Sequence, residues 1–257
     1  MGDFENWKDK YLEYVDKVID FIPYKRLAEW KKFGLDPLPK VSKPDSIMQR
    51  IKDIYVMLII TLFFRLLGML PALVIGGAFF VIYSILLLGI PLIILAAVLG
   101  VIFVLWLLSP VFIMLYSLVE YAVAKLLGGT GNYTMHFNAG VASSLAAFTF
   151  ELPLLIVYVP LGWLMMIPCL GYLFMIAAFP LSMLMLAIGL YGIYLKFTSF
   201  RKLHELTTGK AAAVVIVPIV LWIMALIALV VMFYLGMFAF LFSLPVIAAG
   251  AGGGAPS

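Results

Sequence analysis

The sequence is poor in charged residues, and this scarcity decides the class of protein. Asp, Glu, Lys and Arg together make up 12% of the 257 residues, whereas 65% of the residues are hydrophobic. A soluble domain is about half apolar and a quarter charged, so no soluble core could bury this excess of apolar side chains. The composition therefore excludes an ordinary soluble domain and predicts a chain that is embedded in lipid.

Cysteine and histidine are also scarce, which removes the usual sources of disulfides and metal sites. Cys169 is the one cysteine and can make no internal disulfide, while two histidines with few acids are a poor set of metal ligands. No Ser-His-Asp set or carboxylate pair is arranged for hydrolysis. We therefore predict no enzymatic activity, no cofactor and no metal, and we interpret His136 and His204 as solvated loop residues at the membrane interface.

Charge is missing from most of the chain because it is concentrated at the N-terminus. Residues 1–53 hold 11 of the 17 Lys and Arg and 10 of the 13 acids. The remaining stretch at 54–249 is apolar and is predicted to be the membrane domain. Because the charges of residues 1–53 nearly balance, this head is not expected to bind nucleic acid. We predict that residues 1–53 form a cytoplasmic, amphipathic helical head that includes a Pro-rich linker.

The first helix of the head carries one apolar stripe, with residues that recur at steps of three and four. The stripe consists of Phe4, Trp7, Tyr11, Val15, Val18 and Ile22. One interpretation is that two head helices pack on each other. The others are a helix that lies on the lipid surface, with Trp7 and Tyr11 at the level of the headgroups, or a helix that grips a partner.

Glycine and proline divide the predicted membrane domain into long apolar runs. A run that can cross a bilayer core of roughly 30 Å is a candidate span. We predict five spans, with an amphipathic juxtamembrane helix at 54–69 before the first and a flexible tail at 250–257 after the last. The spans are expected at about residues 70–89, 91–125, 139–167, 171–196 and 211–243.

Charge and parity bear on whether the stretch 54–69 is itself a span. Only 11 residues separate Asp53 from Arg65, too few to cross the core at about 1.5 Å per residue. Cytoplasmic loops collect Lys and Arg, so the head and segment 196–210, which has four, should lie on the same side. Five spans satisfy this requirement, whereas a sixth does not. We therefore predict an all-α, polytopic membrane helix bundle with a cytoplasmic N-terminus and a C-terminus outside, and a sixth span stays the alternative.

Two stretches of the sequence are similar to a known family. They are "LVEYAVAKLLGGTGNYT" at 118–134 and "AIGLYGIYLKFTSFRKLHELTTGKAAAVVIVP" at 187–218. In both, the chain resembles the Yip-domain family, the Ypt/Rab-interacting five-span membrane proteins and their prokaryotic relatives. The resemblance covers about residues 60–245. It implies a non-enzymatic protein with a cytoplasmic N-terminus that works in vesicle traffic, membrane shaping or binding of prenylated small GTPases. By position it indicates two functional loops, which contain Lys125, Gly128, Gly129, His204, Gly209 and Lys210.

Glu151 is the acid that lies deepest in a predicted span. It is near mid-depth of 139–167, where ionisable side chains cost a few kcal/mol and usually face a protein interior or a cavity. In one interpretation, a protonated Glu151 satisfies the carbonyl of Thr149, which Pro153 leaves without a donor. In the other, it pairs with a buried cation or binds an ion or proton. We interpret Arg65 and Glu120 as interfacial charges.

Together these observations predict an integral membrane scaffold or membrane-organising protein of Yip-like type, which acts through its cytoplasmic head and loops. The alternative is a small transporter or channel subunit with Glu151 in a polar path. The lipid bilayer is the expected partner, and a protein partner at the cytoplasmic face and a homo-oligomer stay open. The protein is expected to be a multi-pass membrane protein, in the plasma membrane if it is prokaryotic.

Overall fold

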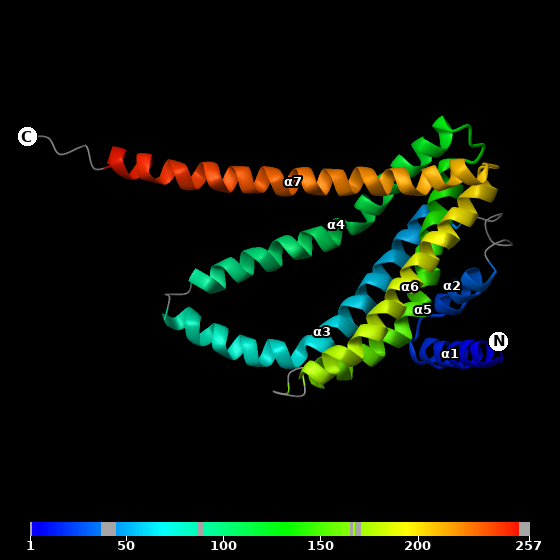
Figure 1. Ribbon diagram of the computed structural model, residues 1–257, viewed down its shortest axis with the longest axis horizontal. Coiled ribbons are helices and arrows are strands. Elements are labelled where there is room, and N and C mark those ends of the chain that lie inside the picture. Colours follow the sequence, from blue (N-terminus) through cyan, green and yellow to red (C-terminus); the bar gives the residue numbers. More distant parts are fainter. Residues whose placement is uncertain (1, 37–44, 87–89, 165–166, 168–170, 252–257) are drawn as a thin grey trace, which may run out of the picture.

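The computed structural model describes residues 2–36, 45–86, 90–164, 167 and 171–251, and its ordered elements within these ranges are all helices (Figure 1). They are α1 (Gly2–Phe21), α2 (Arg26–Leu35), α3 (Ile47–Leu86), α4 (Ile90–Leu126), α5 (Tyr133–Leu164), α6 (Gly171–Leu203) and α7 (Thr208–Ala251). The all-α prediction is therefore confirmed for the described part of the chain. Cys169 and the tail residues from 252 onward lie outside the described residues.

Five of these helices are long and apolar enough to cross a membrane, which confirms the predicted number and the multi-pass class. Within the described residues the candidate spans are Ile47–Ala72, Leu99–Leu126, Tyr133–Leu164, Ala178–Leu203 and Thr208–Gly236. The last four overlap the predicted spans. The first covers the stretch 54–69, which we had predicted to be an interfacial helix, and precedes most of the predicted span at 70–89.

This difference arises because α3 does not break where the sequence predicts a break. It continues for 40 residues through Gly68 and Pro71, a length of about 60 Å at 1.5 Å per residue. A proline removes one helical hydrogen bond, but ending the helix in hydrocarbon would expose several backbone groups that find no water there. For the same reason α4, α5 and α6 contain prolines in their interiors. A separate juxtamembrane helix is therefore not observed.

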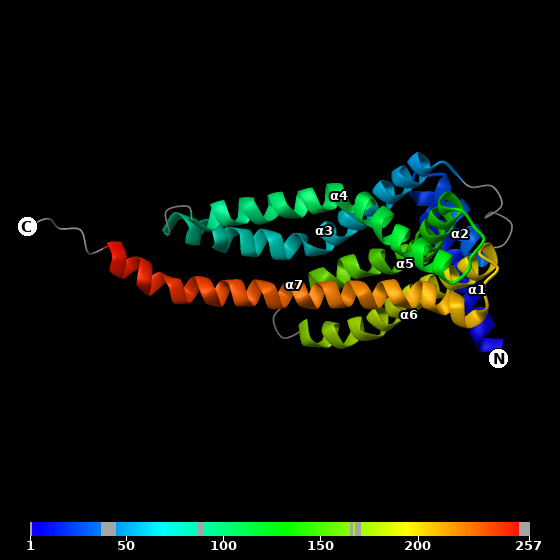
Figure 2. The ribbon, with the colours of Figure 1, turned by 90° about the horizontal axis from the view of Figure 1, so that it is seen from above.

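Helix α5 is the centre of the bundle and contacts α1, α2, α3, α4 and α6. Of the residues in its most apolar stretch, 56% are buried, against 17% or fewer in the other four candidate spans. By contrast, α7 extends away from the bundle toward the C-terminus, as both views show (Figures 1 and 2). Most of its described large apolar side chains between Ile216 and Phe238 are exposed, as expected for a surface in contact with lipid.

The N-terminal head packs on the membrane domain. Val15, Val18 and Ile19 of α1 are buried in the same hydrophobic cluster as Leu27 of α2 and Leu145 of α5. The stripe predicted for α1 is therefore real, but its buried half packs on the centre of the bundle, which none of the three interpretations had specified.

The other part of the stripe is only half-buried. Trp7 is 49% exposed and stacks on Tyr11 with ring centroids 5.5 Å apart. The Tyr11 hydroxyl donates a hydrogen bond to the carbonyl of Phe150 in α5. About half of the Trp7 side chain is therefore exposed, whereas Tyr11 contacts the bundle.

Candidate functional site at the joined polar loops

The loop between α4 and α5 begins with a glycine turn. Gly128 has a φ of +90°, and the N–H of Gly128 donates to the carbonyl of Lys125 at 3.0 Å. The N–H of Gly129 donates to the carbonyl of Ala124 at 2.8 Å. These two bonds form a Schellman motif, which satisfies the last carbonyls of α4 and needs a left-handed residue where Gly128 lies. Gly128 therefore has a structural role in this loop.

The loop between α6 and α7 begins with the same motif, but without a glycine. The N–H of Leu206 donates to the carbonyl of Arg201 at 3.0 Å, and that of Glu205 to the carbonyl of Lys202 at 3.4 Å. Glu205 has a φ of +54°. Because a side chain in the left-handed region costs roughly 1–2 kcal/mol, Glu205 is strained where glycine would not be.

The two loops are in contact, so four of the six residues indicated by the Yip resemblance lie together. The N–H of Thr130 donates to the carbonyl of His204 at 3.3 Å, and Lys210 Nζ donates to the carbonyl of Leu127 at 2.9 Å. Lys125 Nζ reaches the carbonyl of Thr130 at 3.4 Å. A Cβ added at Gly129 would lie 2.9 Å from His204 Nδ1. Lys125, Gly129, His204 and Lys210 thus form one junction, which we call the loop junction.

Gly128 and Gly209 lie beside the loop junction and have open space around them, since a Cβ at either would meet no atom within 4 Å. Gly131, which the resemblance did not indicate, is part of it. A Cβ there would lie 2.9 Å from two atoms of the His204 ring. The ring therefore fits beneath the loop only because residues 129 and 131 lack side chains.

The two histidines are buried in contact with each other rather than solvated. Both have no exposed surface, and His136 Nδ1 lies 2.8 Å from His204 Nε2. The Phe200 ring stacks on His136 at 3.9 Å between centroids. Our interpretation of the histidines as solvated loop residues is therefore wrong. It failed because His136 belongs to the first turn of α5, the most buried helix. Among the described residues, no group of three or more His, Cys, Asp or Glu could hold a metal ion.

Next to His136, an ion pair between Glu120 of α4 and Lys196 of α6 joins these two helices. Glu120, which we interpreted as an interfacial charge, has no exposed surface. Its Oε1 is 2.6 Å from Lys196 Nζ, and its Oε2 is 3.9 Å from His136 Nε2. Lys196 Nζ also lies 4.8 Å from the centre of the Tyr116 ring, within range of a cation–π interaction.

The sequence held a signal for this pair that we did not use. Glu120 lies six residues before the end of α4, and Lys196 lies seven residues before the end of α6. Both helices end at the loop junction, so the two charges are at the same depth. An isolated charge in a membrane helix needs a partner, and opposite charges at equal depth are the natural candidates.

Glu151 faces a cavity, one of the two surroundings expected for it. The cavity has a volume of about 480 Å³ and is lined by residues of α3, α4, α5, α6 and α7. Arg65, Lys196 and Glu151 contribute its charged groups. Arg65 is therefore placed within a candidate span, beside a cavity. Among the described residues, no hydrogen bond joins Glu151 to the carbonyl of Thr149. The Thr149 hydroxyl donates to the carbonyl of Leu145 at 2.9 Å.

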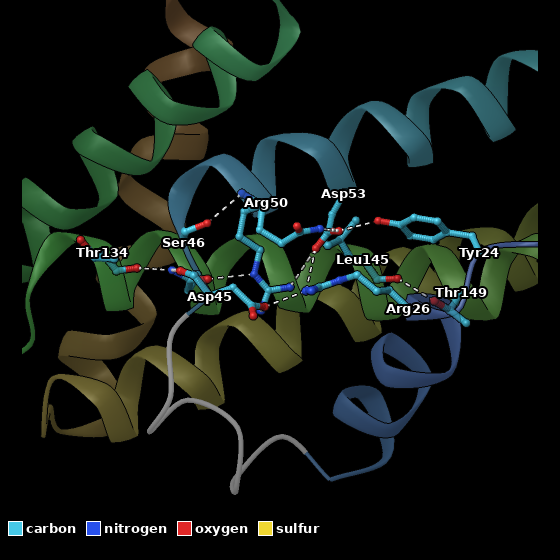
Figure 3. Close-up of polar contacts among 11 residues, drawn as sticks. Tyr24, Arg26, Asp45, Ser46, Arg50, Asp53, Thr134, Leu145 and Thr149 are labelled. Atoms are coloured by element: carbon cyan, nitrogen blue, oxygen red, sulfur yellow. Dashed lines mark hydrogen bonds and ion pairs between the residues drawn. The ribbon is translucent and has the colours of Figure 1, made fainter.

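A second polar network ties the head to the start of α3 and α5 (Figure 3). Asp53, which has no exposed surface, accepts a hydrogen bond from Tyr24 at 2.6 Å and pairs with Arg26 at 3.0 Å. Burial, and then the hydrogen bond to Asp53, raise the pKa of the Tyr24 hydroxyl above its usual range. Asp45 joins Arg26 at 2.7 Å to Arg50 at 2.9 Å. We call these residues the head network.

The head network ends on α5. Arg50 Nε donates to Asn138 Oδ1 at 2.8 Å, and Asn138 Nδ2 donates to the carbonyl of Asp45 at 2.9 Å. The near balance of charge in residues 1–53 predicted a head that does not bind nucleic acid, but it did not indicate which of these charges are buried together.

No protein-family model, curated protein or solved structure matches this chain. Its function is therefore inferred from the residues and their geometry.

Proposed function

We propose that this protein is a non-enzymatic, membrane-organising scaffold of Yip-like type that presents a rigid polar face on the cytoplasmic side. The loop junction is the observation that supports this proposal. It joins two segments that are far apart in sequence into one surface, held by the bond from Lys210 to the carbonyl of Leu127 and the bond from Thr130 to the carbonyl of His204. A loop that served only as a tether would not need this joint. The Yip resemblance indicates the same two loops.

The charge of this face supports its orientation and its role. Lys125, Arg201, Lys202 and Lys210 are exposed around the loop junction, against one exposed acid, Glu205. Such an excess of positive charge is typical of cytoplasmic loops. It also suits contact with anionic headgroups or with an acidic surface of a protein partner. In this proposal the head supports the face, because the head network fixes the beginning of α5.

Orientation is tested by labelling single cysteines in a Cys169→Ala background. Cysteines placed at residues 40 and 207 should react with a membrane-impermeant reagent only from the cytoplasmic side, and one at residue 254 only from outside. Labelling of 40 and 207 from opposite sides would contradict the five-span arrangement.

The role of the face is tested by photo-crosslinking in native membranes, with a photoreactive residue at Thr207, which is exposed in the loop between α6 and α7. Wild-type protein should capture a reproducible set of partners. The triple variant Lys125→Glu, Arg201→Glu, Lys202→Glu should lose them. A control with Lys8→Glu, Lys10→Glu and Lys17→Glu makes the same change of charge on the exposed side of α1 and should keep them. Equal loss in both variants, or no reproducible partner, would rule out the loop face as the acting surface.

The cavity favours a second candidate function, a small transporter or channel subunit. Thr61, Arg65 and Glu151 place polar groups in a cavity between five candidate spans, and intramembrane acids of this kind often mark ion or proton routes. Purified protein in proteoliposomes tests this candidate. A cation- or pH-dependent flux that is lost in Glu151→Gln, with unchanged thermal stability, would favour transport over the scaffold. We expect no flux from the wild type.

A further inference from the structure

Four ionisable side chains form a continuous series from the loop junction to the cavity. The series begins at His204, whose Nε2 lies 2.8 Å from His136 Nδ1. His136 Nε2 faces Glu120 Oε2 at 3.9 Å, and Glu120 Oε1 contacts Lys196 Nζ at 2.6 Å. Lys196 in turn lines the same cavity as Glu151. Neither proposed function uses this series, and a purely structural core would be satisfied by apolar residues.

The direction of the hydrogen bonds follows from the charge of Lys196. Beside this ammonium group Glu120 is a carboxylate, which can only accept. Its negative charge therefore favours the N–H of His136 at Nε2, which faces Glu120 Oε2 at 3.9 Å without a hydrogen bond. The Nδ1 of a neutral His136 is then an acceptor, and His204 must donate to it from Nε2. This leaves Nδ1 of His204 without a proton. This assignment of hydrogens is inferred from the network.

Four buried atoms in the series have no hydrogen-bond partner among the described residues. Glu120 Oε1 is compensated by its ion pair with Lys196, and the other three are His204 Nδ1, His136 Nε2 and Glu120 Oε2. Buried polar atoms are normally paired, so these three call for an explanation, and they lie where a proton would enter, pass and arrive. Gly129 and Gly131 cover His204 Nδ1 with backbone alone, and the exposed Thr130 between them brings water close to this end.

We propose that Glu120 is a proton-binding site that is loaded from the loop face through His204 and His136. A proton from water binds His204 Nδ1, and the proton on His204 Nε2 moves to His136 Nδ1. The proton on His136 Nε2 then moves to Glu120 Oε2, once these two atoms close from 3.9 Å to hydrogen-bond distance. One proton enters, both histidines end neutral in the opposite tautomer, and the carboxylate becomes a neutral carboxylic acid.

The surroundings of His204 favour transfer of a proton over its retention on this ring. Burial, together with the neighbouring His136 and Lys125, lowers the pKa of His204 to about 4. At neutral pH this ring therefore passes a proton on and does not hold it. Among the described residues, the other titratable and charged groups around the series are Tyr116, Tyr121 and Lys125 on α4, Tyr133 on α5 and Lys210 on α7.

Loading Glu120 has a direct consequence for the cavity. Lys196 loses its counter-ion, and a buried cation without a partner is strongly disfavoured. Glu151 is the carboxylate that lines the cavity together with Lys196. Protonation at Glu120 therefore drives Lys196 toward Glu151 and changes the charge of the cavity. The site would thus couple the pH at the loop face to the state of the cavity, whichever proposed function the protein performs.

Infrared difference spectroscopy of the full chain in nanodiscs locates the proton. A change from about pH 8 to about pH 5 should produce a protonated-carboxyl band that shifts in D₂O. The band should be absent from Glu120→Gln combined with Lys196→Met, a pair that leaves no unpaired charge. It should persist in Glu151→Gln, which removes the other membrane carboxyl near Lys196. A wild type without the band, or a band that survives in the double variant, would overturn the proposal.

The route is tested by following the same band in time after a rapid drop in pH. His136→Gln and His204→Gln keep polar side chains but cannot relay a proton, so each should slow the rise of the band by on the order of tenfold or more. Tyr121→Phe keeps the aromatic ring beside both histidines and should leave the rate unchanged. This control shows whether a small change in packing around the histidines is enough to slow the band. If a glutamine variant has a lower melting temperature than wild type, the asparagine variant at the same position replaces it. Loading of both histidine variants at the wild-type rate would exclude this route.

Discussion

His136 and Asn138 lie two positions apart at the start of α5 and serve different networks. His136 Nδ1 contacts His204 Nε2 at 2.8 Å, in the loop junction, whereas Asn138 Oδ1 accepts from Arg50 Nε at 2.8 Å, in the head network. Residues two apart on a helix face different sides. The first turns of α5 therefore contact the polar loops on one side and the head on the other.

The close approach of Gly131 to His204 predicts a selective cost for adding one methyl group. Gly131→Ala would place Cβ 2.9 Å from the His204 ring, and we expect it to lower the free energy of unfolding by about 1–3 kcal/mol. Gly209→Ala is the matched control, since a Cβ there meets nothing within 4 Å and alanine favours the first turn of α7. Unfolding midpoints in detergent measure both. Equal midpoints for the two variants would show that the loops do not pack on His204.

The strained turn after α6 predicts a stabilising substitution. Glu205 has a φ of +54°, so Glu205→Gly should relieve the left-handed strain and raise the free energy of unfolding by up to about 1 kcal/mol. Glu205→Ala keeps a Cβ in the same conformation and removes the same charge, so it should bring no gain. A comparison of melting temperatures separates strain from charge. The strain argument fails if alanine stabilises as much as glycine.

Burial of His204 predicts a loss of stability in mild acid. Its pKa is lowered from an ordinary 6.5 to about 4 in the folded protein, so below pH 6.5 the unfolded chain binds a proton that the folded chain does not. The free energy of unfolding should therefore fall as the pH drops from about 6.5 to about 4, by up to about 1.4 kcal/mol per pH unit. His204→Gln should flatten this dependence. An identical pH profile for the variant would show that His204 is not buried in its neutral form.

The buried Asp53 predicts that the head is held by a few charges. Asp53→Asn leaves Arg26 and Arg50 with less compensation, and we expect a cost of about 3 kcal/mol. Asp16→Asn is the control, because this acid is 57% exposed in its pair with Lys31 and should cost less than about 1 kcal/mol. Hydrogen exchange should show faster exchange in α1 and α2 of the Asp53 variant only. Unchanged exchange there would mean that the apolar contacts with α5 hold the head without the network.

The position of the turn after α4 could be predicted from the sequence because it depends on local chemistry. Gly128 is the residue that a helix end in the left-handed region requires, and it lies where the predicted second span ends. The break expected at Gly68 and Pro71 failed for the opposite reason. Their local preference for a turn is weaker than the cost of unpaired backbone groups in hydrocarbon, so α3 continues through both.

The partners of most charged residues could not be predicted because they are set by distances across the bundle. Glu120 and Lys196 both lie near helix ends that face the loops, but nothing local to either residue shows that the fold brings them into contact. The same holds for His136 with His204 and for Arg50 with Asn138. The apolar stripe of α1 predicted a buried face, but only its contact with α5 decided what covers that face.

The sequence by itself determined that this protein is a bundle of membrane helices, because an apolar excess of this size can be accommodated only in lipid and hydrocarbon admits only structures with paired backbones. It also determined the number of candidate spans, since their length is set by the thickness of the bilayer. Tertiary structure alone decided where the charges meet. A buried charge is tolerated only beside a partner, and the partners come from helices that the chain brings together after they have formed.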